Sequence, residues 1–154
     1  MGTLNGEARA VVTVKPDAAF STVTDLGRLP AWNSVMTRVV ECPKHLEPGA
    51  QWVAEFHVLG RTWRSRSTCE LIDAGARRFG YRTQTDDGNP SYATWQWDVE
   101  EADGGSMVTV RFELHPMTFW RRVLLGRIRA RQLIRDELPA SLAALGRASA
   151  VGPG

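Results

Sequence analysis

Residues 51–71, QWVAEFHVLGRTWRSRSTCEL, decide the fold because they predict a β-hairpin with a single favourable register. Two strands, Gln51–Val58 and Arg61–Leu71, flank Leu59-Gly60, and glycine suits the second turn position because that position usually needs a positive φ. When Val58 pairs with Arg61, favourable cross-strand pairs follow on both faces. They are Phe56–Trp63, Ala54–Ser65 and Trp52–Ser67 on one face, and Glu55–Arg64, His57–Thr62 and Gln51–Thr68 on the other. A slip of one residue would disrupt both faces, so we expect this register.

A second hairpin is predicted around the turn Ala102–Gly105. Pairing Glu101 with Ser106 separates an apolar face from a polar one. The apolar pairs are Val99–Val108, Trp97–Val110 and Trp95–Phe112, and the polar pairs are Gln96–Arg111 and Asp98–Thr109. Three further strands are predicted from β-branched or alternating residues, at Ala10–Val14, Val35–Val39 and Arg78–Thr83. The chain therefore has about seven strands, mostly joined as hairpins.

Helical patterns precede and follow most of these strands. Pro16 favours the start of a short helix after the first strand, and Leu29–Trp32 predicts a second short helix or turn. Between Pro116 and Gly146, apolar residues recur every three or four positions, which predicts a long amphipathic helix that Pro139 bends or splits. An antiparallel sheet with one apolar face needs a cover, and only this helix is long enough. The sequence therefore predicts an α+β fold in which a curved antiparallel sheet surrounds the C-terminal helix.

Length and composition indicate one domain, over residues 1–147, followed by a flexible tail at 148–154. No apolar run reaches the roughly 18 residues of a membrane helix, and the N-terminus lacks a signal-peptide pattern, which indicates a cytoplasmic protein. The net charge is +2, but residues 117–147 hold seven arginines and two acidic residues, so that this segment carries +5 and the remainder −3. Such a segment fits an anionic ligand, an acidic partner or weak contact with a membrane surface, and equally a solvated helix face.

The predicted inner face of the sheet combines large aromatic side chains with small ones. Its aromatic residues are Trp52, Phe56, Trp63, Tyr81, Trp95 and Trp97, and its small residues are Ala54, Ser65, Ser67 and Cys69. Apolar walls with a few polar groups are typical of ligand pockets, and large residues beside small ones leave space. The same residues would equally form a filled core, because protein interiors contain few voids.

Several motifs, in order along the chain, resemble the polyketide cyclase/dehydrase branch of the START-like helix-grip (SRPBCC) superfamily over roughly Ala8 to Leu145. They are Pro16-Asp-Ala-Ala-Phe20, Thr24-Asp25, Leu29-Pro-Ala-Trp-Asn33, Gly49-Ala-Gln-Trp52 and Gly104-Gly-Ser-Met-Val-Thr109. The chain departs from the family pattern at Lys15, Ser106 and Pro139. The resemblance implies a deep cavity between sheet and C-terminal helix that holds a polyketide, a lipid or another hydrophobic molecule. It transfers no catalytic residue, because the family has no universal catalytic motif.

We expect this ligand cavity to be lined by the inner-face residues, by the tryptophan of the second short helix and by one arginine of the long helix. The set is Trp32, Trp52, Ala54, Phe56, Trp63, Ser65, Ser67, Tyr81, Trp95, Trp97 and Arg131. Arg131 would bind the polar end of the ligand, or its stem would extend outward across apolar surface. Tyr81 would donate a proton to an enolate, or it would be a core tyrosine with its hydroxyl at the rim.

Other chemistries are not supported by the residue patterns. Ser65 and Ser67 lack the nucleophile elbow and the neighbouring histidine of a serine hydrolase. The three histidines have no metal-ligand spacing, so neither a metal nor another cofactor is expected. Cys42 and Cys69 are expected to be buried, reduced thiols. Aromatic residues and arginines alternate along the strands and so occupy opposite faces, which disfavours a nucleic-acid partner.

Three functions remain open from the sequence. The first is a cyclase or dehydratase that folds a polyketide-like substrate mainly by shape. The second is a non-catalytic carrier or sensor of a lipid or quinone, and the third is an interaction protein that uses its basic C-terminal helix. An ionisable group deep in the cavity would favour the enzyme, an entirely apolar interior the carrier, and a filled interior the interaction protein. The first two bind a hydrophobic small molecule, and a monomer and a homodimer fit all three.

Overall fold

The computed structural model of the chain describes residues 4–33, 35–58, 60–85, 90–115 and 138–151. In chain order the elements are β1 (Leu4–Val12), α1 (Pro16–Thr24), a 3₁₀ turn (Leu26–Arg28), α2 (Leu29–Trp32), β2 (Met36–Glu41), β3 (Gln51–Val58), β4 (Arg61–Asp73), β5 (Arg78–Thr85), β6 (Tyr92–Ala102), β7 (Gly105–His115) and α4 (Leu138–Val151). This order confirms the predicted α+β class, with short helices after the first strand and a helix at the C-terminal end.

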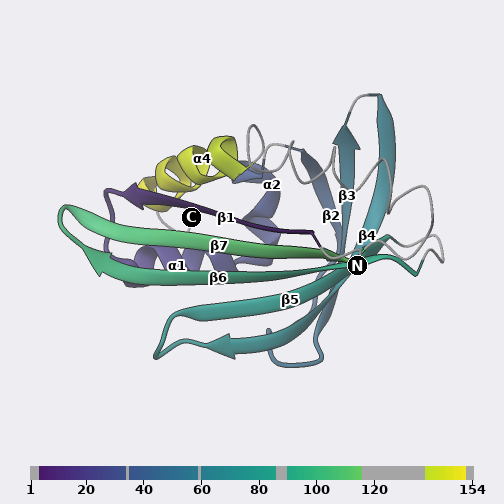
Figure 1. Cartoon of the computed structure of the whole chain (residues 1–154), viewed down its shortest axis with the longest axis horizontal. Helices are drawn as coiled ribbons and strands as arrows, with labels where there is room; N and C mark the ends of the chain where they lie inside the picture. Colours follow the sequence, from purple (N-terminus) through teal and green to yellow (C-terminus); the bar gives the residue numbers. More distant parts are fainter. Residues whose placement is uncertain (1–3, 34, 59, 86–89, 116–137, 152–154) are drawn as a thin grey trace.

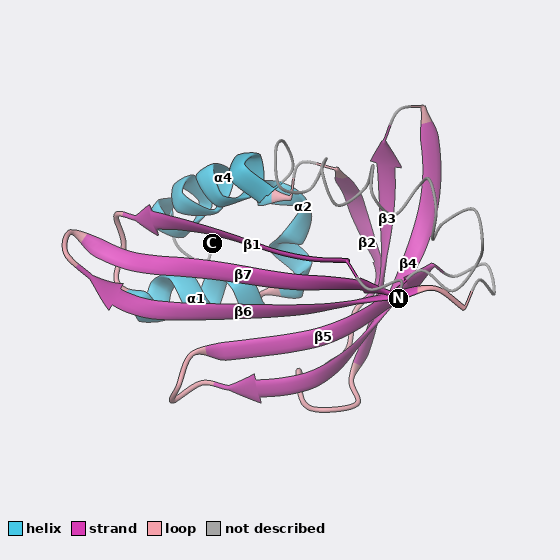
Figure 2. Cartoon of the chain, in the orientation of Figure 1, coloured by secondary structure: helices cyan, strands magenta, loops and turns pink. Residues whose placement is uncertain are grey.

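The seven strands form one curved antiparallel sheet in the order β1-β7-β6-β5-β4-β3-β2 (Figure 1). Helix α1 packs against β6 and β7, α4 against β1 and α1, and α2 against β2 and α4. Figure 2 shows these helices gathered on one side of the sheet. We call the face that meets them the inner face; it supplies half of the buried apolar side chains of the core, and the helices and the 3₁₀ turn supply the other half. The helix-grip architecture expected from the sequence is therefore confirmed.

Both predicted hairpin registers are confirmed. Strands β3 and β4 pair Val58 with Arg61, and β6 and β7 pair Glu101 with Ser106. Gly60, in the turn between β3 and β4, has φ +76°, a left-handed conformation that glycine adopts without steric cost. These registers place the aromatic partners of each hairpin on the inner face and its charged partners on the outer face, which is why a single alignment satisfied both patterns.

The first strand begins earlier and ends earlier than predicted. Strand β1 runs from Leu4 to Val12, whereas the sequence predicted Ala10 to Val14. Gly6 and the charged residues near it have low strand propensity, so the first half of the strand was not predicted from the sequence. Every residue of β1 nevertheless pairs with β7, and its side chains alternate between exposed and partly buried positions. Pairing with the neighbouring strand therefore outweighs local propensity here.

Two further strands depart from simple alternation because their pairing contains irregularities. In β2, the predicted alternation over 35–39 does not hold, and the side chains that pack against the core are those of Met36 and Val39. In β4, a register shift just before Leu71 leaves that leucine exposed and turns Ile72 toward the core. A β-bulge of this kind shifts the inward-facing positions by one residue.

The C-terminal helix is described from Leu138 onward. Helix α4 continues to Val151, beyond the end predicted near Gly146. Pro139 is the second residue of the described helix. The preceding segment, 116–137, lies outside the described residues, and with it the predicted bend and the predicted ligand contact of Arg131.

Candidate functional site

The inner face of the sheet carries a continuous group of aromatic side chains that crosses β3, β5, β6 and β7. We call this group the aromatic wall; its members are Trp32, Trp52, Phe79, Tyr81, Trp95, Trp97 and Phe112. Neighbouring ring centroids lie 5.0–6.5 Å apart, within the favourable range for aromatic pairs. Five of its seven members are at most 4% exposed and belong to the core, whereas Tyr81 and Trp95 are the half-buried members of the wall.

Tyr81 occupies the centre of the aromatic wall. Its ring lies 5.2 Å from that of Trp52 and 6.5 Å from that of Trp95, measured between centroids. Its hydroxyl oxygen accepts a hydrogen bond of 3.2 Å from Nε1 of Trp97. Burial raises the pKa of Tyr81 to about 12, and the hydrogen bond from Trp97 opposes this only in part. The phenol is therefore neutral at physiological pH and keeps its own hydrogen for donation.

Trp32 connects helix α2 to the aromatic wall. Its ring meets that of Trp97 edge-on, with centroids 5.4 Å apart, and only 3% of the residue is exposed. Among the residues that the structure describes, its buried Nε1 has no hydrogen-bond partner. Buried polar atoms are paired in the great majority of cases. This indole N–H therefore marks a position where an acceptor from a water or a bound molecule would be stabilised.

Small side chains lie beside the wall on β3 and β4. Ala54, Ser65 and Ser67 are at most 5% exposed, and they share the inner face with the tryptophans. The hydroxyls of Ser67 and Thr83 form a hydrogen bond of 2.9 Å, so this serine is already partnered. His57 lies exposed on the outer face, as predicted. This arrangement gives no support to a nucleophilic serine.

Phe56 and Trp63 form a separate pair near the free end of the β3–β4 hairpin (Figure 1). Their rings are stacked, with centroids 5.7 Å apart, and both residues are half-buried. Across the described ranges, no ring contact joins this pair to the aromatic wall. The predicted cavity residues therefore fall into three described groups, namely the wall, the small residues and this pair, while Arg131 lies outside the described residues.

Two members of the wall, Phe79 and Phe112, were not included in the predicted cavity. Phe79 is 1% exposed and lies 5.0 Å from Tyr81, and Phe112 lies 5.6 Å from Trp95. The signal was present in the sequence, because the predicted register already placed Phe112 opposite Trp95, and Phe79 shares the alternation of Tyr81. Extending each cross-strand pair to its diagonal neighbours would have found both.

The outer face of the sheet is charged. The carboxylate of Glu55 forms ion pairs with Arg38 at 3.3 Å and with Arg64 at 3.5 Å. The hydrogen bond from Arg38 lowers the pKa of this carboxyl group. Asp98, which is mostly buried, accepts a hydrogen bond of 2.6 Å from Arg111. The predicted pair of Glu55 and Arg64 is therefore confirmed, with an additional arginine from β2. Charged side chains therefore lie mainly on the face opposite the aromatic wall, and Tyr92 is an aromatic residue of the charged face, with Arg82 at 3.7 Å from its ring centroid.

Both cysteines are free thiols, but only one has the predicted environment. Cys69 is buried, and this burial raises the pKa of its thiol. Cys42 is exposed because it lies in the loop that follows β2, so the prediction of two buried thiols was wrong for this residue. Among the described residues, no group of three or more histidine, cysteine or acidic side chains is placed to hold a metal ion. None of the described helices is long and apolar enough to span a bilayer.

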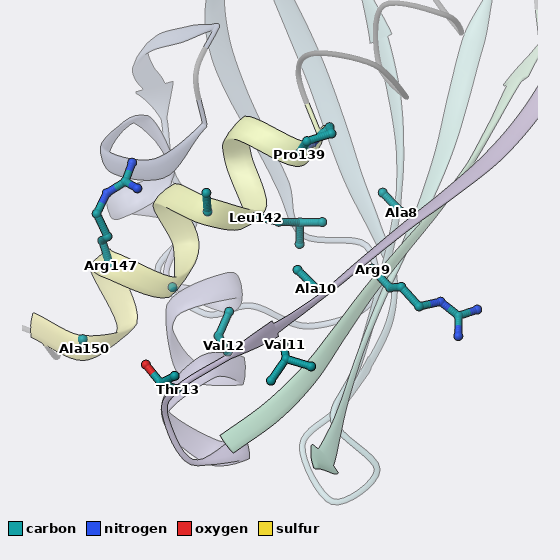
Figure 3. Close-up of a pocket in the computed structure, with 12 residues that line it drawn as sticks. Ala8, Arg9, Ala10, Val11, Val12, Thr13, Pro139, Leu142, Arg147 and Ala150 are labelled. Carbon is teal, nitrogen blue, oxygen red and sulfur yellow. The ribbon is translucent and has the colours of Figure 1, made fainter. Parts of the chain in front are cut away.

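Two open grooves border helix α4. The larger, of about 580 Å³, lies between α4 and β1, and Figure 3 shows Leu142 of the helix directed toward Ala10 of the strand. The smaller, of about 340 Å³, lies between α2 and α4 near Arg28 and Arg147. No residue of the aromatic wall lines either groove. They are therefore distinct from the surface that the sequence predicts to bind a ligand.

The chain is similar to known proteins both in its sequence pattern and in its fold. Residues 3–150 match the sequence model of the family described as polyketide cyclase / dehydrase and lipid transport. No curated protein sequence matches the chain significantly.

Three solved structures illustrate the similarity of fold. Ara h 8.0201 superposes with a TM-score of 0.73 at 17% identity, covering 98% of this chain and 100% of that one. The Zhui aromatase/cyclase from Streptomyces sp. R1128 gives a TM-score of 0.74 at 15% identity, covering 96% and 94%. The di-domain ARO/CYC StfQ from the steffimycin biosynthetic pathway gives 0.77 at 12% identity, covering 97% of this chain and 51% of that one. At these identities the likeness concerns the fold alone.

Proposed function

The chain belongs to the polyketide cyclase/dehydrase and lipid transport family, and from this premise we propose that its aromatic wall binds a hydrophobic small molecule of the polyketide type. The observation that carries this proposal is the contact of seven aromatic side chains across one face of the sheet, with small side chains beside them. Adjacent aromatic rings bind flat, conjugated or cyclic molecules well. Such ligands stack on the rings, and their apolar surface is removed from water.

Two neutral donors in the wall suit a ligand that carries carbonyl oxygens. Nε1 of Trp32 is buried without a partner among the described residues, and the Tyr81 hydroxyl retains its own hydrogen while accepting from Trp97. A carbonyl or enolate oxygen would accept from such groups, whereas a plain hydrocarbon would leave them unpaired. A poly-β-ketone chain carries such carbonyl oxygens, and it also has apolar surface that can pack against the rings.

For such a substrate, we propose a cyclase- or dehydratase-type role in which the wall brings reacting carbons of a flexible chain together. The neutral phenol of Tyr81 would stabilise negative charge as it develops on an enolate oxygen, because a donor fixed in an apolar site needs no reorganisation. The raised pKa of Tyr81, to about 12, fits a hydrogen-bond donor better than a base. No catalytic residue is carried over from the family; Tyr81 is assigned from its position in this chain.

A second candidate is a carrier or sensor that holds a lipid or quinone without changing it. It is favoured by the surroundings of Tyr81, whose ring contacts are with the apolar aromatic residues Trp52, Phe79 and Trp95. The third function predicted from the sequence, interaction through the basic C-terminal helix, depends on a segment that lies mostly outside the described residues and stays a prediction.

Binding is tested with freshly purified protein by native mass spectrometry, which we expect to detect a co-purified apolar molecule. Binding of the fluorescent probe 1-anilinonaphthalene-8-sulfonate is then compared between Trp32→Phe and the matched control Trp63→Phe. Loss of the indole N–H of Trp32 should weaken the binding of a probe or ligand that carries an acceptor by about 5- to 10-fold. The control changes a tryptophan outside the wall and should leave affinity unchanged. Equal effects of both variants, or no binding by the wild type, would contradict the proposal.

The enzyme and the carrier are separated with Tyr81→Phe and a reactive poly-β-ketone thioester. If the protein is a cyclase that uses the Tyr81 hydroxyl, cyclised product should form faster with the wild type than without protein. The rate with the variant should be roughly 10- to 100-fold lower than with the wild type, whereas its affinity for the thioester should change by less than about threefold. A carrier would bind the molecule with no acceleration in either form.

A further inference from the structure

The larger groove beside α4 is bounded on one side by the edge of the sheet. Six consecutive residues, Ala8 to Thr13, line it. Because successive side chains of a strand point to opposite faces, a run of consecutive lining residues means that the main chain at the strand edge borders the groove. Within the described ranges, β1 pairs with β7 alone, at the end of the sheet. The second edge of β1 therefore faces this groove.

The other side of the groove is one face of helix α4. Its lining residues recur at helical spacing, namely Pro139, Leu142, Ala143, Gly146, Arg147 and Ala150. Three of these are alanine or glycine, so another extended chain would meet little steric hindrance from the helix. Figure 3 shows Arg9 and Arg147 directed away from the space between strand and helix, which leaves that space mainly apolar. An exposed strand edge beside such a space suits the addition of a further β-strand.

Strand β1 lacks several of the features that usually protect a free edge, although it carries the charged residues Glu7 and Arg9. Proteins commonly place proline or lysine on such strands, or interrupt them with bulges. Leu4–Val12 contains neither residue and pairs with β7 without a register shift. Val11, which is 51% exposed, is one of two large apolar side chains that are exposed among the described residues. The edge is thus long and regular, and no other strand of the described residues pairs with it.

Charges on β1 favour a second copy of the same strand as the occupant. Glu7 and Arg9 are both exposed, and their side chains form an ion pair of 3.0 Å on the outer face. If two copies pair antiparallel with the two-fold axis at Ala8, Glu7 of each lies opposite Arg9 of the other, which gives two equivalent opposite-charge pairs. An axis one residue away, at 7 or at 9, would set glutamate against glutamate or arginine against arginine.

The inward-facing side chains agree with the same register. An axis at Ala8 sets this alanine opposite its own copy, Gly6 opposite Ala10, and Leu4 opposite Val12. Small residues therefore meet at the axis, and larger apolar residues meet at the ends. We propose that two copies of the chain associate through β1 in this register, forming a two-fold symmetric dimer with one continuous sheet. This dimer does not depend on a bound ligand.

The first test is the dissociation constant of the dimer, measured by sedimentation velocity over a range of protein concentrations. Glu7→Arg and Arg9→Glu each place like charges opposite one another twice per dimer, so each should raise the constant by about tenfold or more. The double variant Glu7→Arg/Arg9→Glu should return it to within about threefold of the wild type. Arg64→Glu, on a strand far along the sheet, is the matched control and should have no effect. A monomeric wild type at about 200 μM, or a dimer unaffected by the single variants, would overturn the proposal.

The second test locates the axis by disulfide formation in a Cys42→Ser background, which removes the exposed native thiol. Facing residues of antiparallel strands have Cα atoms about 4.5–5.5 Å apart, close enough for a disulfide. Ala8→Cys should therefore form a covalent dimer under mild oxidation. In this register Asn5→Cys lies opposite Val11, so its two copies are about 20 Å apart and should not cross-link. Cross-linking at equal rates, or faster cross-linking at position 5, would refute the proposed register.

Discussion

Tyr81→Phe perturbs the centre of the aromatic wall by a single oxygen. In the wild type this oxygen accepts the hydrogen bond from Nε1 of Trp97, at 3.2 Å, and Trp97 is 4% exposed. The phenylalanine ring preserves the packing but leaves the tryptophan N–H buried without its acceptor. A buried donor that loses its partner costs about 1–3 kcal/mol. We therefore expect the free energy of unfolding of the variant to be lower than that of the wild type by this amount near pH 8.

The difference should depend on pH in a direction set by the phenol. The pKa of Tyr81 is about 12 in the folded chain, against an ordinary value of 10.0. The folded state thus holds the proton more tightly than the unfolded state, so this contribution to stability is complete below pH 10 and decreases as the pH rises toward 12. A separation of two pKa units corresponds to a loss of about 1.4 kcal/mol at pH 11 and about 2.7 kcal/mol well above pH 12.

Urea unfolding followed by circular dichroism at pH 8, 10 and 11 measures both effects. The advantage of the wild type over Tyr81→Phe should shrink by about 1.4 kcal/mol between pH 8 and pH 11, because only the wild type has the buried phenol. Tyr92→Phe is the matched control: Tyr92 is the only other tyrosine of the chain, and Arg82 lies 3.7 Å from its ring centroid. This control should follow the pH dependence of the wild type. A wild-type advantage that stays constant from pH 8 to pH 11 would refute the assignment of a buried, neutral phenol.

Two further predictions concern the link between β1 and β7. Ser106 is fully buried and donates a hydrogen bond of 2.6 Å to the carbonyl of Val14, so Ser106→Ala should lower the free energy of unfolding by about 1–3 kcal/mol in urea titrations; an unchanged midpoint would contradict this. Gly105 has φ +153°, and a Cβ there would overlap the carbonyl oxygen of Val12, so Gly105→Ala should cost more than about 3 kcal/mol in thermal unfolding. Gly104→Ala, with open space around it, should cost only about 1 kcal/mol, and equal losses would be inconsistent with this account.

The hairpins were predictable because two independent patterns agreed in each. In β3–β4, pairing Phe56 with Trp63 on one face required pairing Glu55 with Arg64 on the other, and the turn glycine fixed the same alignment. In such cases local residues determine the register, since a slip reverses every side chain. The inner and outer faces of the central strands followed from this alternation without any knowledge of the tertiary structure.

The first strand and the bulge were not predictable by the same means. The segment from Leu4 to Arg9 is a strand because β7 pairs with it, and pairing partners distant in sequence leave no local pattern. The bulge in β4 lies between Cys69 and Leu71, and simple alternation would have directed Leu71 inward. A bulge adds one residue to one strand of a pair, and the alternation of residues in β4 does not mark where it lies.

The site was predictable as a face but not as a set of contacts. Alternation assigned Trp52, Tyr81, Trp95 and Trp97 to one side, and the structure joins these four through ring contacts and one hydrogen bond. It separates the pair at the end of the β3–β4 hairpin from them, because that end extends beyond the helices. Which aromatic residues on one face touch each other depends on sheet curvature and strand length, and neither can be obtained from the pattern of alternation.

The two proposed binding surfaces use different chemical groups of the same sheet, so their tests do not interfere. Ligand binding depends on inward side chains near the sheet centre, and dimerisation depends on main-chain groups and outward charges of the edge strand. Trp32→Phe should therefore weaken ligand binding without altering the dissociation constant of the dimer, and Glu7→Arg should do the reverse. If Glu7→Arg also weakened binding of the probe, the edge strand and the aromatic wall would be coupled through β7, which pairs with β1 and carries Phe112. Only in that case would the two surfaces act as one site.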